Sequence, residues 1–316
     1  MENKVIPIFY ACDDAFVKYT IVSLSSMIKN ASKDYKYKVY VLHTEISDEM
    51  KQKTLDLANE NFEISFVSVE KYLKRFTKKL PVRHYYSKTT YYRLFIADMF
   101  HEYEKAIYID SDTIVLGDIS KLYETDLSNH LIAGCKEQAM EQVDVYGTYV
   151  EKVIGISRHE FFNAGIMLIN CKKFREVKLL DKFIYYLGIY DFVVTQDEDY
   201  LNLICKDDIL WLDQKWNTEL TGNLQYDYDV NEAHILHYIM VNKPWHYRDC
   251  RCADVFWNYA KETSVYNTLM TELENYTKEQ RENDTASALN LAQIAREETE
   301  KEDNFFNVWG DKLPLI

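Results

Sequence analysis

The stretch VIPIFYACDD, residues 5–14, decides the fold class of this chain. Its first eight residues form a mostly apolar run of the length of a buried strand, and two aspartates end the run. Over residues 15–30 apolar side chains recur at three- and four-residue steps, as on one face of an amphipathic helix. Strands are predicted next at 37–42 and 62–69, with a helix at 48–59 between them. This alternation predicts an α/β fold whose parallel strands are joined by right-handed helical crossovers.

A second strand ending in aspartates lies further along the chain. The short apolar run KAIYI at 105–109 is predicted as a central strand, and Asp110-Ser111-Asp112 follows it directly. In an open parallel sheet, ligands bind where strands end and the strand order reverses. We therefore expect the segment after residue 12 and the segment after residue 109 to line one crevice. The remaining elements are predicted as a connector at 71–88, helices at 89–99, 173–187 and 198–205, strands near 131–135 and 234–239, and an apolar segment at 165–170.

The length of 316 residues suits one large or two small domains with a sizeable core. With 8 glycines and 4 prolines, the chain is neither collagen-like nor linker-rich. We predict one compact domain over 1–262. Residues 263–316 are predicted as an acidic, largely helical C-terminal extension, because 271–303 holds ten acidic and four basic side chains. Phe305, Phe306 and Trp309 predict that this end either docks back on the domain or packs against a second copy, as in a homodimer.

The charge and the cysteines exclude several classes of protein. A net charge of −14 without a basic stripe argues against nucleic-acid binding and weakens docking to an anionic membrane. The sequence has no apolar run long enough for a membrane span or the core of a signal peptide. Its six cysteines include no Cys-x-x-Cys pair, which argues against a structural zinc site. We expect a cytoplasmic protein with reduced thiols and no transmembrane segment.

Candidate metal ligands are the carboxylates of Asp110 and Asp112. Asp-x-Asp triplets also occur at 197/199 and 227/229, but only the first follows an apolar strand. Oxygen ligands suit Mg²⁺ or Mn²⁺. His237 lies six residues before Lys243-Pro244-Trp245, and Lys243 can offer a point positive charge to phosphate oxygens. His237 with the two aspartates would form a mixed nitrogen and oxygen site that accepts Mn²⁺.

Two further motifs have a structural and a functional interpretation. The acidic cluster Gln196-Asp197-Glu198-Asp199 is explained by a helix N-terminus, where acids complement the helix dipole. The run Phe162-Asn163-Ala164-Gly165 is explained by a turn that enters a strand. Either motif could instead contact a ligand. The residues alone leave both interpretations open.

Taken together, these motifs resemble glycosyltransferase family 8, and most of all its bacterial lipooligosaccharide α-galactosyl- and α-glucosyltransferases. The resemblance extends from about residue 5 to residue 251 and is carried by the order of the motifs. These are TTYYRL at 89–94, YIDSD at 108–112, FNAG at 162–165, QDEDYLN at 196–202, and His237 followed by KPW at 243–245.

The resemblance implies a GT-A fold, in which one α/β domain surrounds a mixed, mostly parallel sheet. It implies retaining transfer of glucose or galactose from UDP-glucose or UDP-galactose to a lipid-linked or polysaccharide acceptor in cell-surface polysaccharide biosynthesis. The implied cofactor is Mn²⁺, with Mg²⁺ as the alternative, bound by Asp110, Asp112 and His237 between the two UDP phosphates. The other implied donor contacts are Ala11 and Asp13 for uracil and ribose, Lys243 for the diphosphate, Arg93 for the sugar or diphosphate, Asn163, Ala164 and Asp197 for sugar hydroxyls, and Glu137 near the sugar.

Two departures from the family pattern bear on mechanism and location. Close relatives often carry Gln where this chain has Glu198, beside the sugar face opposite the leaving UDP. A carboxylate there could form a covalent glycosyl-enzyme or stabilise an oxocarbenium-like transition state, while in front-face transfer the departing phosphate deprotonates the acceptor. Relatives that dock on membranes carry basic, aromatic tails, whereas this C-terminus is acidic.

Two alternative functions remain open from the sequence. Twenty-six tyrosines invite a self-glucosylating enzyme of the glycogenin type, although tyrosine at half-buried surface explains them more simply. A UDP-sugar-binding protein without turnover could use the same fold. The apparently complete set of Asp110, Asp112, His237 and Lys243 favours a transferase over such a protein.

Overall fold

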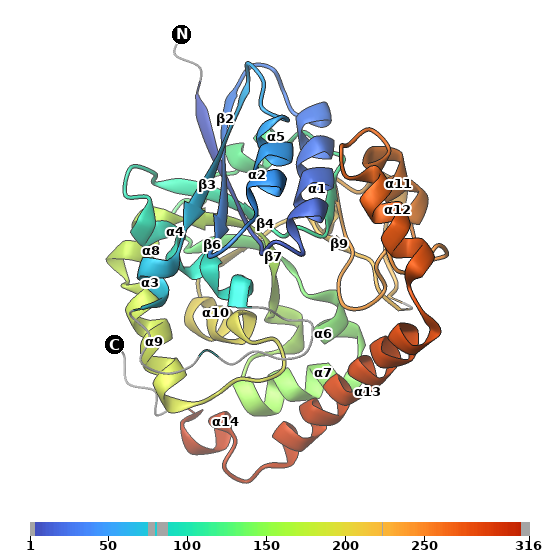
Figure 1. The fold of residues 1–316 in the computed structure, drawn as a ribbon. Helices are drawn as coiled ribbons and strands as arrows, with labels where there is room; N and C mark the ends of the chain where they lie inside the picture. Colours follow the sequence, from blue (N-terminus) through green and yellow to red (C-terminus); the bar gives the residue numbers. More distant parts are fainter. Residues whose placement is uncertain (1–3, 75–79, 81–87, 223, 311–316) are drawn as a thin grey trace.

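The computed structural model describes residues 4–74, 80, 88–222 and 224–310. Its main sheet has seven strands in the order β3-β2-β1-β4-β7-β6-β8 (Figure 1). These strands are β1 (Val5–Ala11), β2 (Lys36–His43), β3 (Phe62–Ser68), β4 (Lys105–Ile109), β6 (Ile132–Lys136), β7 (Phe162–Asn170) and β8 (Ile209–Trp211). Strands β3, β2, β1 and β4 are parallel, whereas β7 is antiparallel to both β4 and β6. The predicted α/β fold with a mixed, mostly parallel sheet is confirmed.

A small second sheet brings a late strand beside an early one. It has the order β5-β10-β9, formed by β5 (Thr113–Val115), β10 (Ile235–His237) and β9 (Thr218–Glu219). Strand β10 is antiparallel to β5 and parallel to β9. Since β5 begins directly after Asp112, this sheet carries residue 237 next to the Asp110–Asp112 segment.

Helices cover both faces of the main sheet, and for that reason its strands are apolar on both sides. Ile8 and Tyr10 of β1 pack in a cluster with α1 and α5, while Phe9 between them packs in a second cluster with α4, α9 and α10. Burial on two faces is typical of sheets with helical crossovers. The helices are α1 (Val17–Asn30), α2 (Asp48–Leu55), α3 (Glu70–Leu73), η1 (Lys88–Phe95), α4 (Ile96–Met99), α5 (Ile119–Glu124), α6 (Gln138–Gln142), α7 (Asp144–Tyr149), η2 (Val150–Ile154), η3 (Arg158–Glu160), α8 (Cys171–Glu176), α9 (Leu179–Ile189), α10 (Asp197–Cys205), η4 (Gln214–Trp216), η5 (Val230–Glu232), α11 (Ala253–Ala260), α12 (Tyr266–Asn275), α13 (Lys278–Glu300) and α14 (Phe305–Val308).

The strand order reverses between β1 and β4. From β1 the chain proceeds outward to β2 and β3, then returns to form β4 on the other side of β1. The register pairs Phe9 with Tyr108, so the two strands end at the same edge of the sheet. A crevice forms at such a switch point because the segments that follow the two strands diverge. The expectation that these two strand ends share one crevice agrees with this topology.

Two predicted helices differ in detail from the structure. The helix predicted at 173–187 is two helices, because Lys178 adopts a left-handed backbone with φ of 53° between α8 and α9. The helix predicted at 89–99 begins as the 3₁₀ segment η1 and becomes α-helical only at Ile96. Most of the connector predicted at 71–88 lies outside the described residues.

The C-terminal segment packs along the domain. Leu269 of α12 and Ala295 of α13 are buried, and Phe305 contacts the rings of Tyr190 and Phe192. Figure 1 shows α13 crossing below α6 and α7, from α12 on the right to α14 at the lower left. Phe305 therefore docks back on the domain, whereas Phe306 stays 41% exposed. The division at residue 262 and a homodimer through this segment stay predictions.

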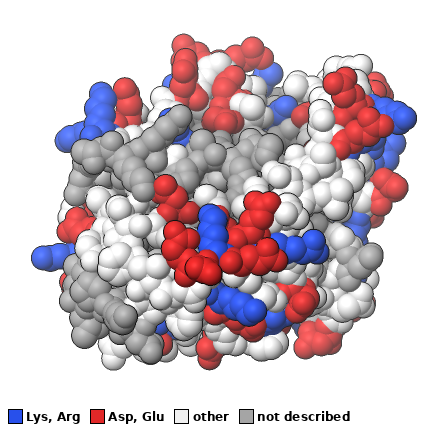
Figure 2. Space-filling model, turned by 90° about the horizontal axis from the view of Figure 1, so that it is seen from below, with Lys and Arg blue, Asp and Glu red and all other residues white. Residues whose placement is uncertain are grey.

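The surface gives two facts about membranes. Among the helices that the structure describes, none is both long and apolar enough to cross a bilayer. Figure 2 views the molecule from below and shows Asp and Glu side chains interspersed with Lys and Arg. On this face the described residues form no broad basic patch that would attract an anionic lipid surface.

Candidate active site

A cavity of about 390 Å³ opens at the edge of the sheet where β1 and β4 end. Such a volume is in the range of small-molecule sites. Its walls come from these strand ends, η1, the start of α10, the segment after β10, and α12 and α13. Ten residues predicted for the site line it: Ala11, Arg93, Asp110, Asp112, Glu137, Asn163, Asp197, Glu198, His237 and Lys243.

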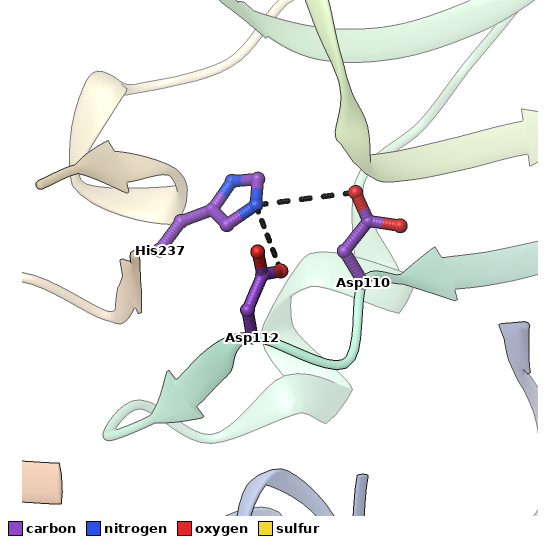
Figure 3. Close-up of side chains that lie close together, drawn as sticks. All are labelled: Asp110, Asp112 and His237. Carbon is purple, nitrogen blue, oxygen red and sulfur yellow. Dashed lines mark ion pairs between the residues drawn. The ribbon is translucent and has the colours of Figure 1, made fainter. Parts of the chain in front are cut away.

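Asp110, Asp112 and His237 lie close together in the wall of this cavity. Each offers one ligand atom, and the three atoms lie within 4.8 Å of one another. His237 Nε2 lies 3.2 Å from Asp112 Oδ1 and 3.9 Å from Asp110 Oδ2, and the close-up in Figure 3 shows the ring directed at both carboxylates. Two carboxylates and one imidazole are a donor set that suits Mn²⁺ and is acceptable to Mg²⁺.

The fold brings these three residues together by strand pairing. His237 pairs with Thr113 in the small sheet, so its side chain lies beside Asp112. The backbone N–H of Asp110 donates to Gly165 O at 2.7 Å, which joins the end of β4 to β7. Gly165 also leaves the space that the ligands need, because a Cβ there would lie 2.4 Å from His237 Cε1 and 2.8 Å from Asp110 Oδ2. The residues present therefore fit a divalent cation.

Hydroxyl groups attach the Asp110–Asp112 segment to helix α1. Thr20 Oγ1 lies 2.7 Å from Ser111 Oγ, and Ser23 Oγ lies 2.7 Å from Thr113 Oγ1. All four residues are buried. Satisfied buried polar contacts of this kind hold a loop in one conformation. They fix the two aspartates relative to the start of α1, where Phe16 also lines the cavity.

Arg93 is buried next to Asp110, and its single positive charge faces two carboxylates. Its guanidinium lies 2.9 Å from Asp110 and 3.1 Å from Asp197, donates to Ala164 O, and lies over the ring of Tyr108. Burial raises the pKa of Asp197 above its ordinary value although Arg93 opposes this change. Arg93 lines the cavity, but its guanidinium is engaged with protein groups.

Lys243 lies on the other side of the same ligand set. Its ammonium donates to Asp112 Oδ2 at 2.5 Å and to Tyr238 O. Burial alone would raise the pKa of Asp112, but Lys243 and His237 hold it well below the usual range. Asp112 is therefore ionised at any physiological pH, as a metal ligand must be.

Glu198 and Glu137 form the carboxylate-rich wall of the cavity. Glu198 Oε2 accepts the Ala164 N–H at 2.8 Å, and Glu137 accepts from Asn163 Nδ2 and from the Ala139 N–H. Burial and the charge of Glu137 raise the pKa of Glu198 well above its ordinary value. Glu198 also lies in the first turn of α10, as the interpretation of the acidic cluster as a helix N-terminus predicted. The same side chain lines the cavity.

Two predicted donor contacts have other roles in this structure. Asp13 Oδ1 accepts the Phe16 N–H at 3.0 Å, so it shapes the turn that leads into α1. Ala164 is buried and uses its N–H for Glu198 and its oxygen for Arg93. Neither residue is among those that line the cavity.

The sequence also missed residues that contribute to the site. Glu272 and Asp284 from the C-terminal segment line the cavity, as does Leu291. Asn217 and Glu219 are completely buried; Asn217 contacts His237, and Glu219 accepts the Gln138 N–H. The acidic composition of 271–303 did not indicate which of its residues face the cavity. Strand β9, which follows Asn217 and contains Glu219, has only two residues, too few to show a hydrophobic period.

Comparison with known proteins identifies the family. The sequence profile described as Glycosyl transferase family 8 matches residues 7–249, which is more than half of the chain. The chain belongs to glycosyltransferase family 8. A glycosyltransferase of Haemophilus influenzae is 32% identical over 77% of this chain and 74% of its own length. The lipopolysaccharide 1,2-glucosyltransferase of Escherichia coli is 25% identical over 77% of this chain and 74% of its own length.

Solved structures agree with this assignment. The galactosyltransferase LgtC, in complex with donor and acceptor sugar analogues, matches with a TM-score of 0.68 and 26% identity, over 82% of this chain and 96% of LgtC. The bifunctional glycosyltransferase WbbM shares the fold, with a TM-score of 0.74 and 24% identity, over 87% of this chain and 52% of WbbM. This family 8 protein is thus a glycosyltransferase enzyme with the GT-A fold of LgtC.

Proposed function

We propose that this glycosyltransferase moves glucose or galactose from the corresponding UDP-hexose to a hydroxyl of a glycan or glycoconjugate, with retention at the anomeric carbon. The observation that carries the proposal is the convergence of Asp110, Asp112 and His237 within 4.8 Å in a cavity that Glu198 and Lys243 also line. The E. coli relative named as a lipopolysaccharide glucosyltransferase supports a lipid-linked or polysaccharide acceptor and a role in cell-surface polysaccharide biosynthesis.

In this proposal Asp110, Asp112 and His237 hold Mn²⁺, or Mg²⁺ as the alternative. When bound, the cation offsets the negative charge that develops on the departing diphosphate. The Lys243 ammonium, which already faces Asp112, adds a second positive charge on the same side. Arg93 favours the ionised forms of Asp110 and Asp197 against the effect of burial and holds them in place, and Asn163 and Asp197 hold sugar hydroxyls.

Glu198 is the carboxylate proposed to act on the sugar. If it attacks the anomeric carbon, the carbon–oxygen bond to the diphosphate breaks, a covalent glycosyl-enzyme forms, and the acceptor hydroxyl then displaces Glu198. If transfer is front-face, the departing phosphate takes the acceptor proton and Glu198 only stabilises positive charge. We predict that Glu198→Gln lowers kcat well over tenfold in the first case. Near-normal turnover would support the second case.

The metal site is tested by two matched double variants. We predict that Asp110→Asn with Asp112→Asn abolishes transfer from UDP-glucose and UDP-galactose with Mn²⁺, while the far-UV circular dichroism spectrum is unchanged. The control is Asp227→Asn with Asp229→Asn, in another Asp-x-Asp triplet whose two aspartates are exposed. We expect full activity from this control. Full activity in the 110/112 variant would remove the proposed metal site.

The same assay tests self-glucosylation. Incubation with UDP-glucose and Mn²⁺ but without acceptor, followed by intact-protein mass spectrometry, would give a ladder of hexose increments if the chain glucosylated itself. We expect no ladder. We also propose a cytoplasmic location, which the six free cysteines support because reduced thiols are typical of that compartment.

A further inference from the structure

Asn217 is a buried amide that touches both halves of the candidate site. It is fully buried at the junction of η4 and β9 and belongs to none of the motifs that indicated the family. Its Oδ1 lies 3.0 Å from His237 Nδ1, and its Nδ2 donates to Asn163 Oδ1 at 2.8 Å. One side chain therefore joins the imidazole of the metal centre to a residue on the carboxylate-rich wall.

The hydrogen-bond partners fix which way the Asn217 amide points. Asn163 Oδ1 also accepts the Gly165 N–H at 2.9 Å, and Asn163 Nδ2 donates to Glu137. The oxygen of Asn163 therefore faces Asn217, so Asn217 must donate to it with its NH₂ group. The oxygen of Asn217 is left for His237. Because an amide oxygen only accepts, Nδ1 of His237 carries the proton.

This orientation has a consequence for the metal ligand. With the proton on Nδ1, the lone pair of His237 lies on Nε2, which faces Asp110 and Asp112. Partners of this kind set the tautomer and the ring orientation of metal-binding histidines. The donors also run in one direction, from His237 through Asn217 and Asn163 to Glu137, so the ring orientation and the wall are held by one buried network.

We propose that Asn217 is a positioning residue with two separable roles. Its oxygen fixes the tautomer of His237 for Mn²⁺, and its NH₂ group fixes Asn163, and through Asn163 the carboxylate of Glu137, for the donor sugar. This inference rests on the proposed function.

Two variants of Asn217 separate the roles. Asn217→Leu has similar size and removes both contacts. Asn217→Asp keeps an oxygen for His237 and turns the other oxygen towards Asn163 Oδ1. We expect Asn217→Leu to weaken Mn²⁺ binding 10- to 100-fold, measured by electron paramagnetic resonance of free Mn²⁺ in titrations without nucleotide. We expect Asn217→Asp to bind Mn²⁺ within about threefold of the wild type, yet to lose at least tenfold in kcat at saturating Mn²⁺, an effect of the order expected for partners of site residues.

The matched control is Asn170→Leu, at the far end of β7. Asn170 caps α8 by accepting the Lys173 N–H and donates to His130 O, so its loss lowers the melting temperature without touching the cavity. We expect wild-type Mn²⁺ affinity from it. The proposal is overturned if Asn217→Leu binds Mn²⁺ like the wild type, or if Asn217→Asp loses Mn²⁺ affinity as much as Asn217→Leu. If Asn217→Leu does not fold, Asn217→Asp alone tests the proposal. A wild-type kcat in Asn217→Asp would overturn the role of Asn217 in positioning Asn163. A loss of Mn²⁺ affinity in Asn217→Asp would overturn its role in fixing the tautomer of His237. Undiminished Mn²⁺ binding in the 110/112 double variant would instead mark the failure of the proposed metal site.

Discussion

Replacing Arg93 by methionine would leave two carboxylates near the cavity without their cation. The guanidinium lies 2.9 Å from Asp110 and 3.1 Å from Asp197, and the Arg93 side chain is only 5% exposed. The cost of losing Arg93 is larger for Asp197 than for Asp110. The Asp197 side chain is only 4% exposed, whereas the Asp110 side chain is 25% exposed and also accepts a hydrogen bond from Tyr108. Methionine is also an unbranched side chain that can pack against the Tyr108 ring, but it carries neither the charge nor the donors of the guanidinium.

The size of the effect follows from what Asp197 can do without Arg93. It can stay ionised and unpaired, and breaking a buried ion pair in this way costs about 3–5 kcal/mol. Alternatively it can become protonated. For a carboxyl of ordinary pKa near 3.9, protonation costs about 5 kcal/mol at pH 7.5 and about 2 kcal/mol at pH 5.5, at about 1.4 kcal/mol per pH unit. Because burial already raises the pKa of Asp197 in the wild type, part of this cost is present before the substitution and these values are upper limits. We therefore predict that Arg93→Met destabilises the protein by at most about 3–5 kcal/mol at pH 7.5 and by at most about 2 kcal/mol at pH 5.5.

The assay is urea unfolding of the metal-free protein at the two pH values, followed by circular dichroism. Arg175→Met is the control, because Arg175 is half-buried and its guanidinium donates to the backbone oxygens of Ala97 and Tyr103. Arg175→Met removes hydrogen bonds but leaves Asp110 and Asp197 paired with Arg93. The loss of unfolding free energy should therefore be nearly equal at pH 5.5 and 7.5. If Arg93→Met shows an equally pH-independent penalty, the charge argument is wrong.

Two further predictions test the space and the titration of the site. Gly165→Ala should abolish Mn²⁺ binding and transfer, because the added Cβ would lie only 2.4 Å from His237 Cε1. The control Gly188→Ala in α9 should keep both activities, because no atom lies within 4 Å of its added Cβ. Mn²⁺ binding by Gly165→Ala would refute the close packing. Burial raises the pKa of Asp199 to about 6 despite hydrogen bonds from Thr195 and Tyr149, so the folded state binds this proton more tightly than the unfolded state. Its contribution to stability is complete below about pH 4 and is lost as the pH rises through about 6, which removes about 1 kcal/mol between pH 5 and 7.5. Urea unfolding of Asp199→Asn should lack this loss, and an unchanged pH dependence would contradict the assignment.

The residues proposed as metal ligands could be predicted because each has a local signature. Asp110 and Asp112 follow an apolar strand, and His237 lies at a fixed distance from the Lys243 motif. Such local patterns can be recognised in the sequence even when the residues that contact them in the fold are unknown. Their meeting point within 4.8 Å, however, depends on β10 pairing with β5 across more than one hundred residues of chain. Long-range pairing of this kind has no local pattern.

The C-terminal segment shows the limit of composition. Its acidic composition predicted a largely helical extension without indicating any contact with the site, and α13 is indeed a 23-residue helix with few buried side chains. Glu272 and Asp284 nevertheless line the cavity, because Glu272 contacts Lys18 and Tyr19 at the start of α1, and Asp284 contacts Tyr247 close to the Lys243 motif. Which face of a polar helix meets a cavity is decided by packing and not by its charge.

The sequence by itself determined the α/β class and the residue types that can hold a divalent cation, because apolar periods and strand-end aspartates are local properties. The order of its motifs indicated the family. Only the tertiary structure decided how those residues are supported. Arg93 between two carboxylates, Gly165 beneath the imidazole and Asn217 between His237 and Asn163 owe their roles to neighbours that are distant in sequence. Buried polar groups must find partners wherever the fold supplies them, and those partners exist only once the chain has folded.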